Sequence, residues 1–250
     1  MWRKCENAMR TGPMPEAERL LHNRNMRQSA RRAIVLLSGG LDSATTLYLA
    51  QSKGYECQCL IIDYGQRHKR EVMAAQAIAR KADSPFQIIR LQFPWGGSAL
   101  TDWRRPVPTD RSFQKIGQGI PSTYVPARNT IFLSCALSFA EGIGADSIFI
   151  GANAIDFSGY PDCRPAYYRA IQRVARLGTK AGVEGKPIRI RTPLIRKNKA
   201  QIIRMGIRLA VPYHLTWSCY RGASHPCGRC DSCLLRAKGF QEAGEKDPSL

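Results

Sequence analysis

Residues 34–47 read Ile-Val-Leu-Leu-Ser-Gly-Gly-Leu-Asp-Ser-Ala-Thr-Thr-Leu, and this stretch decides the fold. It begins inside a short apolar run, Ala33–Leu37, of the kind that forms a buried parallel strand. A helical pattern follows at Leu41–Lys53 and ends before Gly54. The loop between the two patterns therefore lies at the carboxyl end of a strand, where open α/β sheets bind their ligands.

The loop Ser38–Ser43, Ser-Gly-Gly-Leu-Asp-Ser, is a candidate phosphate site. Glycines let backbone N–H groups approach an anion closely, and the following helix directs its positive dipole end at the same anion. The Ser38 and Ser43 hydroxyls add donors, and Asp42 has two candidate roles, capping the helix or holding a phosphate-bound magnesium ion. The signatures G-x-x-x-x-G-K-[ST] and G-x-G-x-x-G are both absent. The structural alternative is a Gly-rich strand–helix turn with a serine cap.

Apolar runs and helical patterns alternate along the rest of the chain, which predicts a doubly wound parallel sheet of the α/β class. Further strands are expected at Cys57–Ile62, Phe86–Leu91, Ser147–Ile150 and Ile188–Ile190. Further helices are expected at Arg70–Ala82, Thr130–Gly142, Ala166–Leu177 and Lys197–Leu209, with a short helix in the C-terminal segment. Ser98–Tyr124 is rich in Pro, Gly and Arg and is interpreted as a long loop, and such loops are often functional.

Composition sets the broad class of the protein. The chain has 250 residues, of which 44% are apolar, enough for a globular domain with a real core. It lacks an apolar stretch of the roughly 18 residues that a transmembrane helix needs, and its polar N-terminus lacks the apolar segment of a secretory signal. We therefore expect a cytoplasmic protein with a disordered basic extension (1–32), an α/β domain that contains the candidate phosphate loop (33–210) and a C-terminal module that contains a cluster of cysteines (211–250). The extension, with eight Lys or Arg against three Glu, also gives a weak case for an organelle transit peptide.

The charge is strongly positive and uneven. Thirty-eight basic residues against nineteen acidic ones give +19, and Arg164–Arg208 alone holds thirteen Lys or Arg and one acid, Glu184. A basic field favours anionic partners such as nucleotides or RNA. Because base-stacking aromatics are sparse in this segment, a cationic surface without a polymer partner is the preferred interpretation.

Several longer motifs narrow the function. They are Asp63-Tyr64-Gly65-Gln66-Arg67-His68 with Glu71, Tyr124-Val125-Pro126-Ala127-Arg128-Asn129, Gly151-Ala152-Asn153, Asp156-Phe157-Ser158-Gly159-Tyr160-Pro161-Asp162-Cys163-Arg164, and Thr216-Trp217-Ser218-Cys219-Tyr220. The Ser-Gly-Gly-x-Asp-Ser loop resembles the PP-loop ATP pyrophosphatase superfamily. Its members resemble one another in binding ATP with this loop and generally activate an oxygen as an adenylate. Together with the longer motifs, nearly the whole chain resembles the 7-cyano-7-deazaguanine synthase family (QueC).

The resemblance implies an ATP-dependent ligase that converts 7-carboxy-7-deazaguanine and ammonia to the nitrile preQ0, in queuosine or archaeosine biosynthesis. A carboxylate is a poor electrophile, so adenylation makes its oxygen a leaving group. Ammonia then gives an amide, and a second activation with elimination gives the nitrile. The implied partners are small-molecule substrates, and neither a membrane nor tRNA is required. The resemblance also implies a homodimer. Two alternatives stay open: a PP-loop enzyme that thiolates or amidates tRNA, and a zinc-stapled RNA-binding module that has lost catalysis.

Site residues are carried over from the resemblance by position. For catalysis it implies Ser38, Asp42, Ser43 and Lys199, where Lys199 supplies charge to a phosphate or else lies on a solvated helix face. For ATP it implies Leu36, Leu37, Ser38, Gly39, Gly40, Leu41, Asp42, Ser43, Ala44, Thr45 and Thr46. For the substrate it implies Arg128, Asn129, Asp156, Tyr160, Asp162 and Arg164. These residues offer a carboxylate for the N1–H and 2-amino edge, an aromatic for stacking and a cation for the substrate carboxylate. Nucleotide-pocket candidates are Asp63, Gln66, Arg67 and His68.

The cysteines indicate a metal site. Cys227, Cys230 and Cys233 form C-x2-C-x2-C, and Cys219 lies eight residues upstream, close enough to fold back as a fourth ligand. Four thiolates suit a closed tetrahedral zinc site, and the resemblance implies the same four as structural zinc ligands. His225 as a substitute ligand and an iron–sulfur cluster stay open as alternatives. The expected cofactors are thus ATP, Mg²⁺ and Zn²⁺. Cys163, within the substrate motif, is expected to line the pocket.

Overall fold

The computed structural model describes residues 31–155 and 159–249. Its five strands are β1 (Arg31–Leu36), β2 (Tyr55–Asp63), β3 (Phe86–Arg90), β4 (Ser147–Ile150) and β5 (Arg189–Arg191). All four pairings are parallel, and the strand order is β3-β2-β1-β4-β5. The prediction of a doubly wound parallel sheet is confirmed. The expected extension at 1–32 falls almost entirely outside the described residues.

Strand β1 forms the centre of the sheet because both of its faces are apolar. Ala33 and Val35 contribute to one core cluster, and Ile34 and Leu36 contribute to the other, all four being buried. Side chains alternate between the two faces of a strand. A continuous apolar run is therefore what a strand covered by helices on both sides requires.

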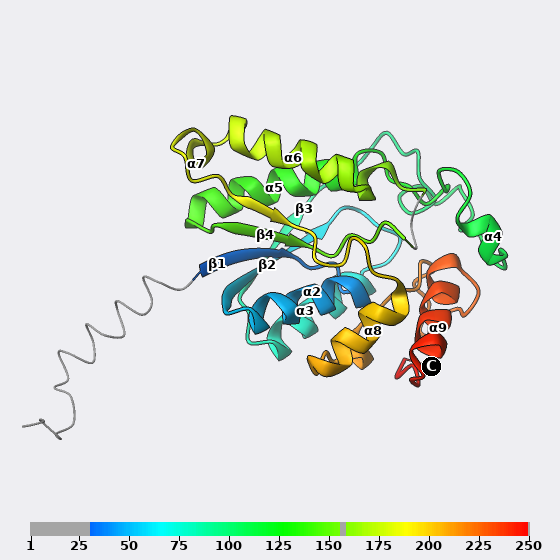
Figure 1. Ribbon diagram of the computed structural model, residues 1–250. Helices are drawn as coiled ribbons and strands as arrows, with labels where there is room; N and C mark the ends of the chain where they lie inside the picture. Colours follow the sequence, from blue (N-terminus) through cyan, green and yellow to red (C-terminus); the bar gives the residue numbers. More distant parts are fainter. Residues whose placement is uncertain (1–30, 156–158, 250) are drawn as a thin grey trace, which may run out of the picture. The chain divides into compact units, whose positions relative to one another are not determined.

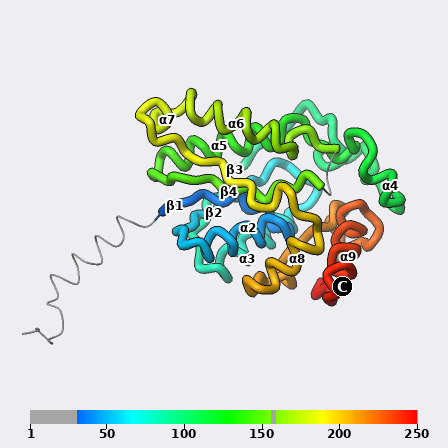
Figure 2. Tube along the Cα trace, in the orientation of Figure 1, coloured from blue at the N-terminus to red at the C-terminus, as the bar shows by residue number. Residues whose placement is uncertain are grey.

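Two layers of helices cover the sheet, as Figures 1 and 2 show. The helices are α2 (Leu41–Ser52), α3 (Arg70–Lys81), α4 (Phe113–Ile116), α5 (Arg128–Ile143), α6 (Pro165–Gly178), α7 (Lys180–Val183), α8 (Lys199–Arg208) and α9 (Asp231–Ala243). Helices α2, α3 and α8 pack on one face, and α5, α6 and α7 lie on the other. Within the described ranges, no helix is both long and apolar enough to cross a membrane.

The observed elements differ from the expected ones mainly at their ends. Strand β1 begins two residues earlier than expected, and β2 begins at Tyr55 instead of Cys57. Helix α5 begins at Arg128 rather than at Thr130, because Ala127 adopts a left-handed backbone (φ 53°) and turns the chain there. Helix ends depend on such local turns more than on apolar periodicity. The expected long loop contains the short helix α4.

Strand order creates a switch point beside β1. The chain runs from β1 outward through β2 to β3 and then returns to β4 on the other side of β1. The loops after β1 and β4 therefore diverge and leave a crevice at the carboxyl edge of the sheet, where such folds bind ligands. This crevice is where the sequence places the Ser38–Ser43 loop.

Candidate functional site

A cavity of about 240 Å³ lies at this edge of the sheet. The ends of β1, β2 and β4 form its floor, and the Ser38–Ser43 loop and the segment Gly151–Asn153 line one side. Helix α5, the segment Trp217–Tyr220 and helix α9 complete the wall. The cavity therefore collects residues from parts of the chain that are far apart in the sequence.

Two serine hydroxyls organise the Ser38–Ser43 loop. The Oγ atoms of Ser38 and Ser43 lie 3.0 Å apart, and the backbone N–H of Ser38 donates to Ser43 Oγ (3.2 Å). Ser43 Oγ in turn donates to the carbonyl oxygen of Gly40 (3.0 Å), the N-cap residue of α2. No side chain caps this helix, so Asp42 does not play the capping role considered from the sequence. The first residues of α2, Leu41, Asp42 and Ser43, line the cavity, so the uncapped N-terminus of this helix lies where an anion could bind.

Glycines at two positions allow the loop to pack closely against its neighbours. Gly39 has φ +85°, and a Cβ atom there would lie 2.2 Å from the carbonyl oxygen of Glu71. A Cβ atom on Gly151, after β4, would lie 2.9 Å from the backbone of Asp42 and Ser43. Side chains at these positions would push the loop away from α3 and β4, so glycine sets its place at the switch point.

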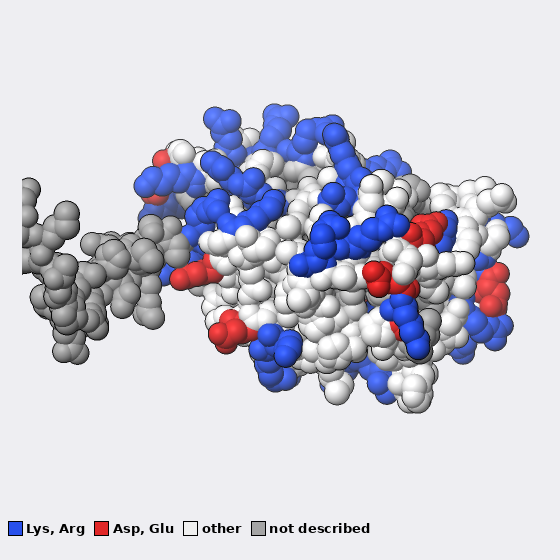
Figure 3. Space-filling model, turned by 60° about the horizontal axis from the view of Figure 1, so that its bottom comes forward, with Lys and Arg blue, Asp and Glu red and all other residues white. Residues whose placement is uncertain are grey.

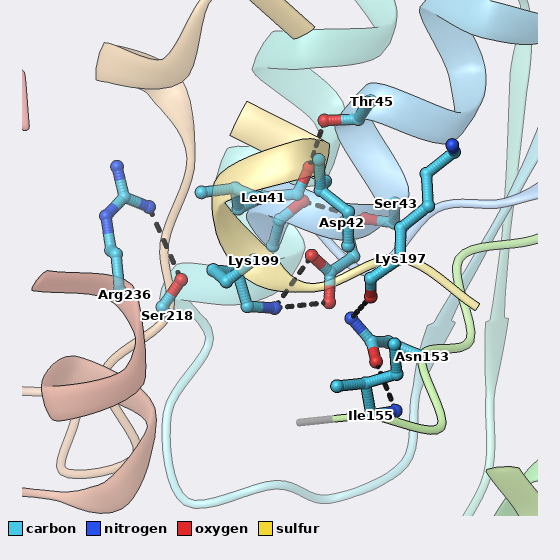
Figure 4. Close-up of polar contacts among 12 residues, drawn as sticks. Leu41, Asp42, Ser43, Thr45, Asn153, Ile155, Lys197, Lys199, Ser218 and Arg236 are labelled. Carbon is cyan, nitrogen blue, oxygen red and sulfur yellow. Dashed lines mark hydrogen bonds and ion pairs between the residues drawn. The ribbon is translucent and has the colours of Figure 1, made fainter. Parts of the chain in front are cut away.

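A buried ion pair closes the phosphate end of the cavity (Figure 4). Lys199 Nζ lies 2.8 Å from each carboxylate oxygen of Asp42, and the two side chains are 10% and 19% exposed. Lys199 is thus at the site and not on a solvated helix face. Asn153 braces the opposite side, because its amide donates to the Lys197 carbonyl (2.8 Å) and its oxygen accepts from the Ile155 N–H (2.8 Å).

Lys199 is held in place by the helices on either side of it. It is the first residue of α8, whose N-cap Asn198 forms a reciprocal capping box with Gln201. The neighbouring α9 approaches so closely that a Cβ atom on Gly239 would lie 2.2 Å from Lys199 Cγ and 3.0 Å from Ile203 Cδ1. The absence of a side chain on Gly239 therefore leaves the space that the Lys199 stem occupies.

Replacing Gly239 by alanine tests this packing. We expect the free energy of unfolding to fall by about 1–3 kcal/mol, the usual range for overpacking. We also expect activity to fall roughly tenfold to hundredfold, because small displacements of a positioned charge are costly. Gly142→Ala in α5 is the matched control, since a Cβ atom there meets nothing within 4 Å; it should be neutral or stabilising. Urea unfolding and steady-state rates measure both effects, and equal behaviour of the two variants would contradict the packing argument.

The other end of the cavity surrounds Arg128. This residue begins α5, directly after the left-handed Ala127, and its Nη1 donates to Tyr64 Oη (3.3 Å). Its guanidinium also lies over the rings of Tyr64 and Phe132, at 5.7 and 6.0 Å from their centroids. The Arg128 Nε atom is buried without a hydrogen-bond partner among the described residues. Since a buried guanidinium N–H without a partner is costly, this end of the cavity is suited to an anionic or carbonyl group.

Glu71 is a second charged group at this end. It lies in the first turn of α3 and lines the cavity, and its side chain makes no hydrogen bond to a described residue. Burial raises the pKa of the Glu71 carboxyl to about 7, and the Arg128 guanidinium opposes that rise. The sequence placed Glu71 beside a motif but gave it no role.

The residues expected to bind substrate divide into three groups. Arg128, Asn129 and Tyr160 line the cavity. Asp162 is buried but does not line it, because its carboxylate accepts the backbone N–H of Asn129 (3.2 Å) at the start of α5. Arg164 is exposed at the N-cap of α6. These two side chains therefore support or flank the cavity, and Asp156 lies outside the described residues.

The four residues predicted to line the nucleotide pocket also differ in whether they reach the cavity. Gln66 lines the cavity, and its side-chain oxygen accepts the backbone N–H of Tyr64 (2.9 Å). Asp63, Arg67 and His68 do not line it. Cys163 does line it, and burial raises the pKa of its thiol to about 12, so the thiol is protonated at neutral pH. A nucleophilic Cys163 therefore does not fit the structure.

Some residues of the cavity wall were harder to identify as site residues from the sequence. Trp217, Ser218 and Tyr220 flank the first cysteine of the cluster, and Ser232, Leu235 and Arg236 lie on α9. The backbone N–H of Trp217 donates to the Gly39 carbonyl (2.9 Å), so this segment contacts the phosphate loop directly. The Thr216–Tyr220 motif marked the segment, whereas nothing local marked the α9 residues.

The four cysteines converge on one point. The Sγ atoms of Cys219, Cys227, Cys230 and Cys233 all lie within 4.8 Å of one another, and His225 is not in the group. Around a single ion with metal–sulfur bonds of about 2.3 Å, tetrahedral sulfurs are roughly 3.8 Å apart. Cys227 and Cys233 are 4.0 Å apart. The spacing therefore fits one tetrahedral ion better than a larger iron–sulfur cluster.

Hydrogen bonds prepare these thiols to bind a cation. The backbone N–H groups of Cys227 (3.3 Å) and Arg221 (3.4 Å) donate to Cys219 Sγ. The backbone N–H of Cys230 also donates to Cys227 Sγ (3.3 Å). Cys230 is the N-cap of α9, so the positive end of this helix faces the cluster. These backbone donors and this helix end therefore favour the thiolate form of Cys219 and Cys227, the form that binds metal.

The cysteine cluster also anchors the long loop. Thr109 forms an isolated antiparallel bridge with Cys230, and the Asp110 N–H donates to the Arg229 carbonyl (2.9 Å). Arg111 pairs with Asp231 (3.0 Å). Because Leu100 of the same loop lines the cavity, the metal group and the cavity are connected through this loop.

Removing the metal should therefore loosen the loop before it affects the sheet. We expect Cys230→Ser to lose its metal and to lower Tm by about 10 °C, which corresponds to about 3–5 kcal/mol for a chain of this size. Hydrogen exchange should rise first in residues 104–116. Cys135→Ser in α5, a thiol outside the group, is the control and should keep its metal. Elemental analysis measures the metal content of both variants, and thermal melting measures their Tm. A Cys230→Ser protein with full metal content would contradict the assignment of Cys230 as a metal ligand.

Sequence comparisons find closely similar proteins. The family model described as "Queuosine biosynthesis protein QueC" matches residues 32–244. The chain is 56% identical over 225 residues to the 7-cyano-7-deazaguanine synthase of Anaeromyxobacter dehalogenans (strain 2CP-C), covering 88% of this chain and 95% of the relative. It is 53% identical over 219 residues to the enzyme of the same name from Nostoc punctiforme (strain ATCC 29133 / PCC 73102), covering 87% and 98%.

Solved structures show a more distant similarity. NMN synthetase from Francisella tularensis is 15% identical, covers 91% of this chain and 83% of its own, and has a TM-score of 0.47. A 4-thiouridine synthetase–RNA complex with bound ATP is 16% identical, with coverage of 86% and 50% and a TM-score of 0.47. Similarities of this size support no inference about substrate or partner.

Proposed function

The chain belongs to the QueC family of queuosine biosynthesis proteins, and on that premise we propose that it is a 7-cyano-7-deazaguanine synthase. The proposed reaction joins 7-carboxy-7-deazaguanine and ammonia with the use of ATP and gives the nitrile preQ0. The observation that carries the proposal is a single cavity with an anion-binding loop at one end and the buried guanidinium of Arg128 at the other.

The phosphate end accounts for ATP use. Backbone N–H groups at the start of α2 and the Ser38 and Ser43 hydroxyls would hold ATP phosphates. Lys199 would neutralise charge that develops as pyrophosphate leaves, and Asp42 holds its ammonium at the cavity wall. The proposed ATP stretch is Leu36–Thr46, of which Thr45 and Thr46 are buried and donate to carbonyls one turn earlier in α2. Those two threonines support the loop from behind.

The other end accounts for the carboxylate substrate. Arg128 would hold the substrate carboxylate, and the rings of Tyr64, Phe132 and Tyr160 would border the flat heterocycle. With the carboxylate held by Arg128 in the same cavity as ATP, attack on the α-phosphate and later attack by ammonia become intramolecular events. Adenylation supplies the leaving group that a carboxylate lacks, first for the amide and then for the nitrile.

The cofactors follow from the donor sets. We propose zinc for the four-thiolate group, because closed Cys₄ sites are typical of structural zinc. Mg²⁺ would enter bound to ATP phosphates, since it usually keeps several waters and is held through substrate. Four reduced thiols at one site suit a reducing compartment such as the cytoplasm. A homodimer is proposed from the family resemblance alone.

Small molecules are the proposed partners in preference to tRNA. Figure 3 shows Lys and Arg side chains in several groups with neutral surface between them, and not as one continuous strip, on the face that it draws. One basic residue of the Arg164–Arg208 segment, Lys199, is buried against Asp42. The relatives reported above are named as synthases of a small molecule, which also favours this assignment.

Mass spectrometry of the reaction products tests the function. Purified protein with ATP, magnesium, ammonium and 7-carboxy-7-deazaguanine should yield a product with the mass of preQ0, and omission of ATP should abolish it. An amide without nitrile would show that the second activation fails. If neither compound forms while the protein is folded and metal-loaded, the proposed activity is wrong.

A further inference from the structure

The cavity contains few acidic side chains. Among the described residues that line it, only Asp42 and Glu71 carry carboxylates. Asp42 is occupied by Lys199 through both oxygens. Of the two carboxylates predicted for the substrate edge, Asp162 accepts from the Asn129 backbone and does not line the cavity, and Asp156 lies outside the described residues. Glu71 is therefore the carboxylate in the lining whose side chain has no hydrogen bond to another described residue.

The backbone of Glu71 is fixed in place. Its backbone carbonyl packs against Gly39, where a Cβ atom would lie 2.2 Å away, so the start of α3 is fixed against the phosphate loop. Arg128 and Tyr220, which also line the cavity, interact electrostatically with it. A positioned carboxylate in a wall of aromatic rings is expected to have a ligand with matching donors.

The proposed substrate has such donors. A guanine-like ring presents two parallel N–H groups on one edge, the ring N1–H and the exocyclic 2-amino group, and a carboxylate accepts both with its two oxygens. The carboxyl group of the same substrate lies on the opposite side of the ring system and needs a cation. Glu71 and Arg128, on separate walls of one cavity, provide this complementary pair.

We propose that Glu71 is the specificity-determining residue that binds the N1–H and 2-amino edge of the deazaguanine ring. The inference rests on the proposed function and adds the group that distinguishes a guanine-like ring from one without the amino group. A site built to accept hydrogen bonds rejects an analogue that lacks the donor more strongly than an apolar pocket rejects a change of size.

The test compares two substrates and two variants. The substrates are 7-carboxy-7-deazaguanine and its analogue that lacks the 2-amino group. Wild-type protein should use the analogue with kcat/KM about 10–100-fold lower, the usual effect of a lost hydrogen bond to a charged group. Glu71→Gln places an amide donor against a substrate donor, so kcat/KM for the natural substrate should fall about 10–100-fold while the difference between the substrates shrinks to a few-fold. Glu56→Gln, an exposed acid at the amino end of β2, is the control and should match wild type.

Other outcomes would overturn the assignment. If Glu71→Gln lowers the rates of both substrates equally and keeps the discrimination, Glu71 acts in proton transfer instead. If the variant raises KM for ATP alone, Glu71 contacts the nucleotide, and an unchanged variant removes any role. Thermal melting and Glu71→Asp separate these outcomes from misfolding, because the shorter carboxylate should recover part of the discrimination. If wild type makes no nitrile, the proposed function fails, and calorimetric binding of the two ring compounds still tests Glu71.

Discussion

Lys199→Met is expected to lower kcat/KM for nitrile formation by about 10²–10³-fold, the effect of removing one preorganised charge or donor from a reacting site. Lys199 is buried, and its ammonium lies 2.8 Å from both oxygens of Asp42 beside the phosphate loop. Methionine keeps the length and apolar stem of lysine, so the packing against Gly239 is retained. The loss should appear in kcat more than in KM for ATP, because the charge acts as pyrophosphate leaves.

The stability of this variant should fall less than its activity. Asp42 loses its partner but stays 19% exposed to the cavity, so the cost should be about 1–3 kcal/mol. Lys186→Met, at an exposed position, is the control and should match wild type in both measurements. The double variant Asp42→Asn/Lys199→Met should be little worse than the poorer single variant, since the two residues act as a unit. Additive losses would mean that Asp42 and Lys199 work independently.

This ion pair shows where sequence reasoning succeeds and where it stops. The elements around it were predicted closely, because an apolar run with buried faces and helical periodicity are local signals. Asp42 and Lys199, however, are 157 positions apart in the chain, and no local pattern indicates that they touch. Lys199 was placed at the site by family resemblance, and only the fold shows which carboxylate holds it.

Polar motifs were harder to interpret than apolar ones. Asp162 and Arg164 lie in a motif typical of a ligand site, yet Asp162 accepts a backbone N–H at the start of α5 and Arg164 is exposed. Buried backbone N–H groups need hydrogen-bond acceptors. The sequence does not distinguish a carboxylate that accepts from such a group from a carboxylate that binds substrate. Glu71 was overlooked for the converse reason, because its environment depends on α5 and on the segment around Tyr220.

The group of metal-ligating cysteines could be predicted because the spacing of cysteines along the chain indicates it. Three cysteines within seven residues must lie on one tight turn, so the chain geometry leaves little freedom. For the fourth metal ligand, the sequence left Cys219 and His225 as alternatives. In the structure Cys219 lies with the other three cysteines. His225 is exposed, and its ring contacts the Ser224 hydroxyl (3.2 Å). The distances between sulfurs, which no spacing gives, then favour a single ion.

The second large effect is expected at the C-terminal tail, where Arg236→Met should lower the free energy of unfolding by about 3–5 kcal/mol. Arg236 pairs with Asp247 through two hydrogen bonds (2.7 and 2.9 Å), and the two side chains are 8% and 5% exposed. The same guanidinium donates to Thr216 Oγ1 (2.7 Å) and Ser218 Oγ (3.3 Å). Its loss leaves the buried Asp247 carboxylate without its cation, with the Ser249 N–H still donating to it (3.0 Å), and this is costlier than the loss of a surface pair.

The control for this prediction lies on the same helix. Lys238 and Glu242 form an exposed pair on α9, with side chains 43% and 48% exposed, so Glu242→Gln should change stability by no more than about 0.5 kcal/mol. Urea unfolding of both variants measures the contrast, and a similar small effect of Arg236→Met would show that water reaches the pair.

The consequence for function follows from the neighbours of Arg236. The segment that it holds includes Trp217, whose backbone N–H donates to the carbonyl of Gly39 in the phosphate loop (2.9 Å). Loosening Thr216 and Ser218 should therefore raise KM for ATP in the Arg236→Met protein, even at temperatures where it is fully folded. Asp247→Asn should show the same change in KM with a smaller loss of stability, because its amide can still accept one hydrogen bond. Through these contacts, the segment around Asp247 helps to fix the shape of the phosphate loop at Gly39, more than two hundred positions earlier in the sequence.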